Sequence, residues 1–312
     1  MQAVPRVVAV VVTWNRRDLL VEALDAVRDQ SSPVAATVVV DNASSDGTAD
    51  VLAAYDGLDV VTLGENTGGA GGFAAGIERA LEKHEPDLVW LMDDDTVAEP
   101  TALEHALATY ARADPAPAVI ASRVVWTDGR DHPMNTPRRK PGASEREVRA
   151  ARAVGAIPIR SASFVSILCD TAVIRERGLP VADYFLWNDD FEFSTRLLRG
   201  HSGLYCPDSV VVHKTRGFGS TDADPGARFY YEVRNKTWLY TRSRGLRPLE
   251  KALYAGSTLR RWSRTILASD DRATLWRGLG RGLLDGIRSG PRSNETVLAH
   301  ARTVTTDQPD GE

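Results

Sequence analysis

Three consecutive aspartates, Asp93 to Asp95, follow directly after an apolar run and are the first residues in this sequence to suggest chemistry. The run, residues 88–92, is typical of a strand that is covered on both faces. Adjacent carboxylates repel one another unless a cation or hydrogen-bond donors compensate their charge. One aspartate would suffice for a polar loop that starts the next helix at Asp95 or Thr96. Three favour a site for Mg²⁺ or Mn²⁺ that bridges a diphosphate.

A second acidic cluster lies in the segment WNDDFEF, residues 187–193, where Asp189 and Asp190 follow an aromatic group. Paired carboxylates near apolar rings can have one pKa raised towards neutrality, which suits a general base. The alternative is a helix start, with Asn188 or Asp189 as the N-cap and Glu192 in the first turn. Both interpretations can hold together, because the pair could begin a helix and still present one carboxylate to a cleft.

Two further features carry weaker signals. His213 ends the apolar run VVVH, and a histidine at a strand end is more often structural than a ligand unless the fold brings it to the aspartates. The glycine-rich segment 64–76 precedes a helical pattern, so its backbone N–H groups could approach a phosphate or a sugar. It is not a Walker loop, because no Gly-Lys-Ser/Thr follows, and it does not follow the first strand as a dinucleotide fingerprint would.

The elements that must position these residues alternate along the first half of the chain. Strand-like apolar runs occupy residues 7–12, 37–40, 59–63 and 88–92, and helical patterns occupy 16–30, 44–55 and 72–83. Such alternation predicts right-handed βαβ units and a parallel sheet. The polar segments TWNRR, DNASSDGT and DDD each follow one of these strands, at the sheet edge where ligands gather.

The second half of the chain is less regular. Strands are predicted at residues 119–126, 163–168, 203–206 and 210–213, the last two separated by Pro207. Residues 127–153 are rich in Pro and Arg and are predicted to form a long loop. We therefore assign residues 1–227 to one α/β domain.

From residue 228 the sequence looks helical and basic. Leu275, Leu279, Leu283 and Ile287 fall on one helix face, with arginines elsewhere. Residues 228–290 are therefore either a helical appendage packed on the core or an interfacial segment lying on an anionic bilayer. Residues 291–312 are polar and are predicted to be a disordered tail.

The composition excludes some classes of protein. The net charge of −4 over 312 residues argues against a general nucleic-acid binder. Cys169 and Cys206 have no metal-ligand spacing and form no disulfide framework, which favours the cytoplasm. We expect no signal peptide at the N-terminus, and no apolar run has the length of a membrane-spanning helix.

Taken in order, these segments resemble the family 2 glycosyltransferases, which have the GT-A fold. The resemblance spans residues 7–240 and rests on VVVTWNRRDLL, VVVDNASSDGT, NTGGAGGFAAG, WLMDDDT, WNDDFEF and a strand-end VVH. NTGGAGGF together with DDD is most similar to actinobacterial galactofuranosyltransferases, with rhamnosyltransferases as close relatives. The resemblance implies a Rossmann-like, mostly parallel sheet flanked by helices. It also implies inverting transfer of galactofuranose from UDP-galactofuranose, with dTDP-rhamnose as the alternative donor.

The resemblance also implies the residues that react. Asp93, Asp95 and His213 would hold a divalent metal, Mn²⁺ or Mg²⁺, and Asp190 would be the catalytic base. In an inverting transfer the base deprotonates an acceptor hydroxyl as that hydroxyl attacks the anomeric carbon. The leaving nucleotide then gains negative charge, which the metal offsets.

The remaining implied residues would bind substrates. Trp187 and Asp189 would place the acceptor, a glycan or polyprenyl-diphosphate-linked glycan in cell-wall or surface polysaccharide synthesis, at the inner face of the plasma membrane. Asp41 would accept a hydrogen bond from the uracil N–H. The residues implied to bind the nucleotide sugar are Thr13, Asn15, Arg16, Asp41, Asn66, Gly68, Gly69 and Asp94.

Two other classes of protein compete with this interpretation. A nucleotidyltransferase also places a metal at a strand end, but it usually has a Gly-rich loop with Lys or Arg after the first strand, where this chain has TWNRRD. A non-catalytic nucleotide-sugar binder would have no need of Asp190 beside intact metal ligands. A purely structural protein would leave both acidic clusters as uncompensated costs.

Overall fold

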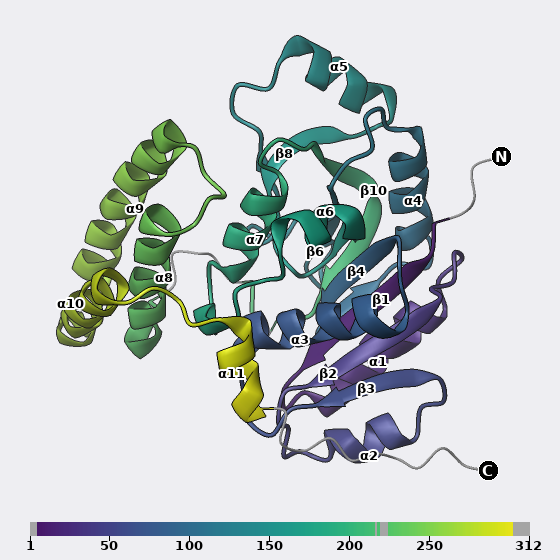
Figure 1. Ribbon diagram of the computed structural model, residues 1–312, viewed down its shortest axis with the longest axis horizontal. Coiled ribbons are helices and arrows are strands. Elements are labelled where there is room, and N and C mark those ends of the chain that lie inside the picture. The colour runs from purple at the N-terminus through teal and green to yellow at the C-terminus, as the bar shows by residue number, and fades with distance from the viewer. Residues whose placement is uncertain (1–4, 216, 219–223, 302–312) are drawn as a thin grey trace.

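The computed structural model describes residues 5–215, 217–218 and 224–301. A ten-stranded sheet forms its centre, in the order β3-β2-β1-β4-β9-β6-β10-β8-β7, with β5 paired to β10 (Figure 1). The strands are β1 (Val7–Thr13), β2 (Ala36–Asp41), β3 (Leu58–Thr62), β4 (Leu88–Asp93), β5 (Thr96–Ala98), β6 (Val119–Val125), β7 (Arg138–Arg139), β8 (Ile157–Ser161), β9 (Ile167–Asp170) and β10 (Gly203–His213).

Helices cover both faces of this sheet (Figure 1). They are α1 (Arg17–Arg28), α2 (Thr48–Ala53), α3 (Gly68–Lys83), α4 (Ala102–Arg112), α5 (Glu145–Ala153), α6 (Thr171–Arg177), α7 (Asp189–Leu197), α8 (Phe229–Thr241), α9 (Pro248–Ala268), α10 (Arg272–Arg288) and α11 (Asn294–Ala301), with 3-10 turns η1 (Ala182–Tyr184) and η2 (Gly226–Arg228). No helix of the described residues is long and apolar enough to cross a bilayer.

The predicted α/β fold with a mostly parallel sheet is confirmed. The strands β1, β2, β3 and β4 pair in parallel in the order β3-β2-β1-β4, as the alternation of strands and helices requires. Strand β9 is inserted antiparallel between β4 and β6, and β10 pairs in parallel with β6. The strands β1, β2, β3, β4, β6 and β10 therefore run in one direction, and the carboxyl ends of β1, β2 and β4 share one edge.

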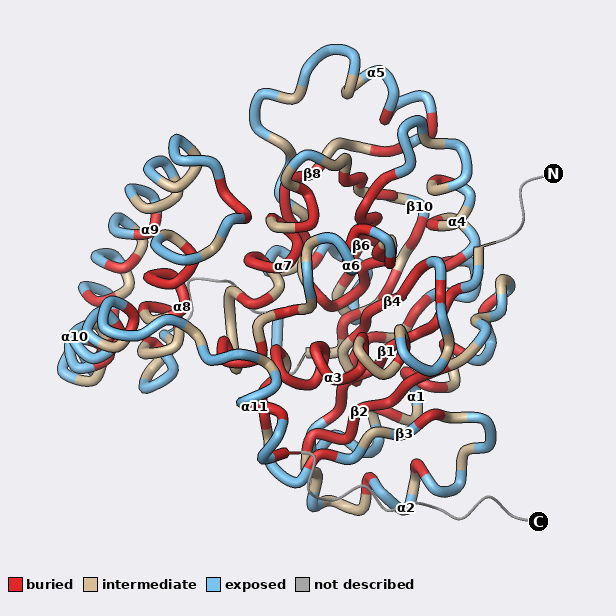
Figure 2. Tube along the Cα trace, viewed as in Figure 1, coloured by how far each residue is buried: buried red, intermediate tan, exposed pale blue. Residues whose placement is uncertain are grey.

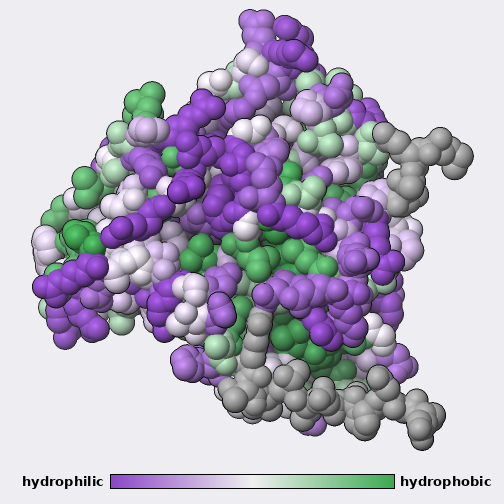
Figure 3. Space-filling model, in the orientation of Figure 1, coloured by the Kyte–Doolittle hydropathy of each residue, from purple (hydrophilic) through white to green (hydrophobic). Residues whose placement is uncertain are grey.

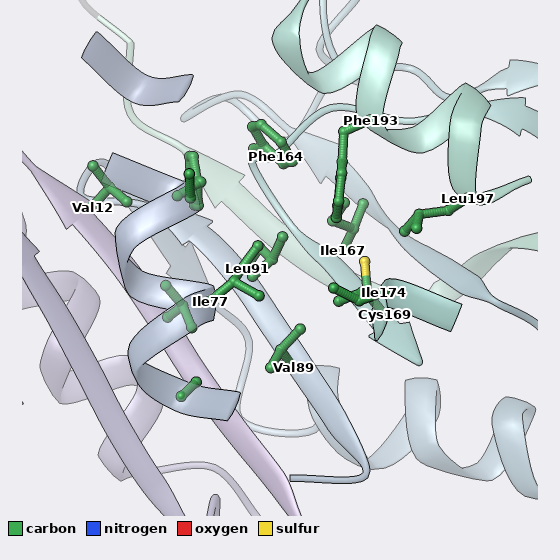
Figure 4. Close-up of a cluster of buried hydrophobic side chains, with 14 of the residues drawn as sticks. Val12, Ile77, Val89, Leu91, Phe164, Ile167, Cys169, Ile174, Phe193 and Leu197 are labelled. Carbon is green, nitrogen blue, oxygen red and sulfur yellow. The ribbon is translucent and has the colours of Figure 1, made fainter. Parts of the chain in front are cut away.

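Two apolar cores lie on the two faces of the sheet. Every residue of β1 is therefore buried, and Figure 2 shows this strand among the buried segments at the centre of the molecule. Its residues Val8, Val10 and Val12 pack with α3, α6 and α7, and Figure 4 shows part of this cluster around Phe164 and Phe193. The alternate residues of β1 pack with α1 and α4 on the other face. Gly76 allows α3 to lie close to the sheet, since a Cβ there would come 2.5 Å from the Cγ1 atom of Val10.

Several predicted boundaries are corrected by the structure. The strand predicted at 163–168 is β9, at Ile167–Asp170, because residues 162–166 form the turn after β8. The two strands predicted around Pro207 are one strand, β10, with a register shift between Cys206 and Val210. A bulge at this point accommodates the missing N–H of the proline.

The predicted loop at 127–153 is also wrong in part, because it contains β7 and α5. Ser144 and Glu147 form a capping box that begins α5. The predicted disordered tail is corrected as well, since residues 294–301 form α11. Val297 and Leu298 of this helix are buried in the core with α3. Residues 302–312 lie outside the described residues, and the domain limits at 227 and 290 stay predictions.

Candidate active site

Asp94 ties the end of β4 to the loop after β1. Val12 pairs with Asp93 in the parallel register of these strands, so the two strand ends lie side by side. Asp94 Oδ2 accepts hydrogen bonds from Thr13 Oγ1 at 2.8 Å and from the Trp14 N–H at 3.1 Å. Arg16 Nη1 lies 3.3 Å from Asp94 Oδ1. The predicted residues Thr13, Arg16 and Asp94 therefore share one wall of the site.

The third aspartate is held by Arg16 and His213. Asp95 is buried and forms an ion pair with Arg16, and its Oδ1 atom lies 3.0 Å from His213 Nε2. Strand β5 brings this histidine into place, because β5 pairs antiparallel with β10 and sets Thr96 opposite His213. The Lys214 N–H also donates to the Asp95 carbonyl at 2.8 Å. The sequence pattern did not predict β5. This strand occupies the position after the aspartates at which a helix start was considered as the alternative.

Asp93, Asp95 and His213 form a group with the chemistry of a metal site. One ligand atom from each lies within 4.8 Å of the others. Asn135 Nδ2 donates to Ser163 Oγ at 3.2 Å, which leaves Asn135 Oδ1 to accept from His213 Nδ1 at 2.9 Å. A neutral His213 with its proton on Nδ1 therefore turns the lone pair of Nε2 towards Asp95.

This geometry calls for a positive charge between the two side chains. Asp95 Oδ1 is buried and accepts no hydrogen bond within the described residues. Two lone pairs would repel each other at that point unless a proton or a metal ion lay between them. Two carboxylates and one imidazole suit Mn²⁺ or Mg²⁺, so the residues present fit the predicted divalent cation.

The pKa values of the three aspartates reflect this crowding. Burial and the neighbouring Asp95 raise the pKa of Asp93 to about 7, and burial raises the pKa of Asp94 to about 6 despite Arg16. Burial also acts to raise the pKa of Asp95, but a His213 protonated on Nε2, together with Arg16, outweighs burial and holds this pKa below its ordinary value. A bound cation would favour the ionised form of all three carboxylates.

The other polar residues predicted to bind the nucleotide sugar lie at the ends of β1, β2 and β3 or in the loops that follow these strands. Asn15 Oδ1 accepts from the Ser45 N–H at 2.7 Å, and Asp41 Oδ1 accepts from the Ser44 N–H at 2.9 Å. Asn66 Oδ1 accepts from the Gly68 N–H at 2.8 Å. Within the described residues, Asn15, Asp41 and Asn66 form no hydrogen bond with the three aspartates. They line the strand ends of β1, β2 and β3 instead.

The amino end of α3 meets the loop that carries the second acidic cluster. Helix α3 begins at Gly68, earlier than the predicted start at residue 72. Gly68 has a φ of 70°, and a Cβ on it would overlap the carbonyl group of Phe185. A Cβ on Gly69 would lie 3.8 Å from Asp189 Oδ2. Glycine is thus required at Gly68 by both backbone conformation and space, and the predicted Gly68 and Gly69 face the second cluster.

The loop before α7 is strained and is held by a buried amide. Phe185, Trp187 and Asn188 all have positive φ, at 63°, 65° and 64°. Such residues cost about 1 kcal/mol or more each and persist where the surroundings hold them. Asn235 of α8 provides this support, because its Nδ2 donates to the carbonyls of Tyr184, Leu186 and Trp187 at 2.8–2.9 Å.

Asp189 and Asp190 begin α7, as predicted, although the Asn188 side chain does not cap the helix. It donates to Glu232 of α8 instead, at 2.7 Å. Burial, with the charges of Asp190 and Asp93, raises the pKa of Asp189 well above its ordinary value. The influence of Asp93 on Asp189 means that the two acidic clusters, distant in sequence, lie within electrostatic reach of each other.

Cations lie beside Asp190. Desolvation raises the pKa of Asp190, while the Phe191 N–H, Lys236 and Arg138 oppose that rise. Both cations also contact the Phe191 ring, with Lys236 Nζ 4.7 Å and the Arg138 guanidinium carbon 5.2 Å from its centroid. Burial lowers the pKa of Lys236 to about 8. Asp190 thus combines a raised pKa with nearby cations that favour its ionised form.

The sequence interpretation missed Asn135, Asn235 and Lys236. Asn135 lies in the segment predicted as a loop, and nothing local connects it to His213. Asn235 and Lys236 belong to the segment FYYEVRNKTWLY, in which Glu232, Asn235 and Lys236 recur at helical spacing among aromatic residues. A polar stripe on an otherwise apolar helix was a signal that this helix faces a polar site.

The chain is similar to one known family and to known proteins. The sequence model described as "Glycosyl transferase family 2" matches residues 8–169. Galactofuranosyltransferase GlfT1 of Mycobacterium tuberculosis is 30% identical over 276 residues, covering 78% of this chain and 84% of the relative.

Two solved structures share the fold at low sequence identity. TarS 1–349 of S. aureus, solved in complex with UDP, has a TM-score of 0.63 at 18% identity and covers 95% of this chain and 83% of that one. The mannosyltransferase PcManGT of Pyrobaculum calidifontis, solved with GDP-Man and Mn²⁺, has a TM-score of 0.54 at 20% identity and covers 96% and 79%.

The role of Asn135 leads to a prediction about metal binding. Replacing Asn135 with Leu removes the acceptor for His213 Nδ1, so the imidazole loses its fixed tautomer and orientation. We expect the dissociation constant for Mn²⁺, measured by calorimetric titration, to rise about 10- to 100-fold. Met134→Leu, a change at the exposed neighbouring side chain, is the control and should leave it unchanged. Equal affinity in Asn135→Leu and the wild type would contradict this account of His213.

Proposed function

The chain belongs to glycosyltransferase family 2, and on that basis we propose that it moves a sugar from a nucleotide diphosphate to a glycan hydroxyl with inversion at the anomeric carbon. The observation that carries this proposal is the separation of two acidic groups within one site. Asp93 and Asp95 converge with His213 on one point, while Asp190 lies apart from them beside Lys236. One group is suited to the leaving diphosphate and the other to the attacking hydroxyl.

The first group would bind the donor. When bound there, a divalent cation would offset the charge that develops on the diphosphate. Asp93, Asp95 and His213 would supply its ligands, and Arg16 would remain as a second positive charge at the same edge. The amino end of α3, with Gly68 and Gly69, would lie along the donor sugar or its phosphates. Because the Gly68 N–H already donates to Asn66 Oδ1, the Gly69 N–H and the positive end of the helix dipole would face the donor.

The second group would bind and activate the acceptor. Asp190 would accept the proton of the attacking hydroxyl, and its raised pKa makes it a stronger base than an exposed carboxylate. Asp189 and Trp187 would position the acceptor, in a loop that Asn235 holds in a strained conformation. A preformed loop lowers the entropy cost of bringing the hydroxyl to the donor.

The proposal extends to the identity of the donor sugar and of the acceptor. The best candidate donor is UDP-galactofuranose, which the 30% identity to galactofuranosyltransferase GlfT1 supports. The acceptor would be a glycan, lipid-linked through a polyprenyl diphosphate, in cell-wall or surface polysaccharide synthesis at the inner face of the plasma membrane. Transfer of rhamnose from dTDP-rhamnose is the second candidate, because the same site residues would serve it.

The donor can be tested by binding and hydrolysis with purified protein and Mn²⁺. The donors are UDP-galactofuranose, UDP-galactopyranose, UDP-glucose and dTDP-rhamnose. We expect metal-dependent hydrolysis of UDP-galactofuranose alone, the donor that the similarity to galactofuranosyltransferase GlfT1 supports. Asp93→Ala should abolish metal-dependent binding, whereas Asp190→Asn should keep donor binding and lower transfer about 10²- to 10⁴-fold.

Other outcomes of this experiment would change the proposal. Preference for dTDP-rhamnose would keep the mechanism and replace the donor. If Asp190→Asn loses donor binding rather than turnover, Asp190 belongs to a binding site, and a non-catalytic nucleotide-sugar binder is favoured. If no nucleotide sugar binds in the presence of Mn²⁺ or Mg²⁺, the transfer proposal fails.

The cation beside Asp190 leads to a prediction about pH dependence. A base must be ionised, so activity is lost as the pH falls through the raised pKa of Asp190. Lys236 opposes the rise of that pKa, so Lys236→Met should raise it further and move the acid limb of the kcat profile to higher pH. Lys83→Met removes a distant lysine that pairs with Asp59, and its acid limb should match the wild type. An unmoved limb in Lys236→Met would contradict the assignment of Asp190.

A further inference from the structure

Helix α10 turns its smallest residues inward and its largest apolar residues outward. Gly278, Gly282 and Gly286 are buried against α8, where a Cβ on Gly282 would lie 2.8 Å from the Cβ of Val233. On the outer side, Trp276 is 60% exposed and Ile287 is 64% exposed. Of the face predicted from the sequence, only Leu275 is fully buried. The structure therefore leaves an apolar stripe of α10 without a partner in the described chain.

Helix α9 also exposes large apolar residues. Leu249, Leu253, Leu259 and Leu267 of α9 are each 60–72% exposed. Eight of the twelve large exposed hydrophobic residues in the described part of the chain lie on these two helices. Figure 3 shows apolar side chains recurring along the outer edge of the molecule over α9 and α10. We call this surface the α9/α10 face.

Arginines are interleaved with the apolar residues of the α9/α10 face. Residues 248–288 contain eight basic and four acidic side chains, a net charge of +4 in a chain whose net charge is −4. Arg260 and Arg264 lie on the exposed side of α9, between Leu253 and Leu267 in sequence. Within the described residues, neither they nor the four arginines of α10 form an ion pair with a carboxylate.

We propose that the α9/α10 face docks on the surface of an anionic phospholipid bilayer. Exposed leucines and a tryptophan would enter the boundary between headgroups and acyl chains, and the unpaired arginines would contact lipid phosphates. A second copy of this chain fits the face less well. Two such faces would bring unpaired arginines together, with few carboxylates to neutralise them.

Docking at this face would place the candidate acceptor site near the bilayer. Helix α8 lies between the α9/α10 face and the candidate acceptor site, with Val233 and Thr237 against the glycines of α10. Its other side holds the loop before α7, residues 185–188, through Asn235, and its Glu232 accepts from Asn188. One helix thus separates the bound lipid surface from the loop at Asp190. The docking proposal uses no residue of the transfer reaction, so either can fail without the other.

Vesicle sedimentation tests the proposal with the full chain. The vesicles are pure phosphatidylcholine, and phosphatidylcholine with about 30% phosphatidylglycerol to supply negative charge. We expect the protein to sediment with the anionic vesicles only, and less at high salt. The double change Trp276→Ser and Ile287→Ser, and separately Arg260→Gln with Arg264→Gln, should each lower the partition coefficient at least about tenfold.

The controls separate docking from folding and from catalysis. Arg146→Gln with Arg149→Gln alters an exposed basic helix, α5, and should sediment like the wild type. All variants should keep the circular dichroism spectrum and the UDP affinity of the wild type. The proposal is overturned if the wild type does not sediment with anionic vesicles. It is also overturned if the variants of the α9/α10 face sediment with them as well as the wild type does. A concentration-dependent dimer that Trp276→Ser with Ile287→Ser abolishes, without vesicle binding, would also overturn it.

Discussion

The crowding of three carboxylates at the end of a buried strand is the constraint on which the rest of this site depends. Asp93, Asp94 and Asp95 cannot all ionise there without compensating charge. Asp94 obtains donors from the loop after β1, and Asp95 obtains Arg16 and His213 from two different directions. The parallel register of β1 with β4 and the antiparallel pairing of β5 with β10 both serve this end. The point between Asp93, Asp95 and His213 remains suited to a metal ion.

The second acidic cluster is placed relative to the first by helix packing. Gly68 lets α3 meet the loop at Phe185, and this brings Asp189 towards the metal group. Helix α8 then fixes that loop through Asn235 and supplies Lys236 beside Asp190. The helices after the sheet are therefore more than an appendage to the core. Their inner side completes the candidate acceptor site, and their outer side carries the α9/α10 face.

Much of this arrangement could be predicted because it follows from local patterns. The strands β1 to β4 are apolar runs separated by helical periods, and their polar ends were recognisable as one edge of a sheet. Contacts between distant residues could not be read in this way. Strand β5 has three residues and exists because it pairs with β10, and Asn135 meets His213 across 78 residues of sequence. The leucine spacing of α10 predicts that its leucine face packs against the protein. The structure instead buries the glycine face, because glycines allow α10 to lie close to α8.

The measurement that tests the central claim most directly is anomalous diffraction at the manganese edge, from crystals grown with Mn²⁺ and UDP. The account predicts one strong peak, ligated by Asp93, Asp95 and His213 Nε2 and in contact with the diphosphate, with Asp190 outside its coordination shell. A manganese peak at Asp189 and Asp190, or UDP bound with no metal at the end of β4, would contradict it.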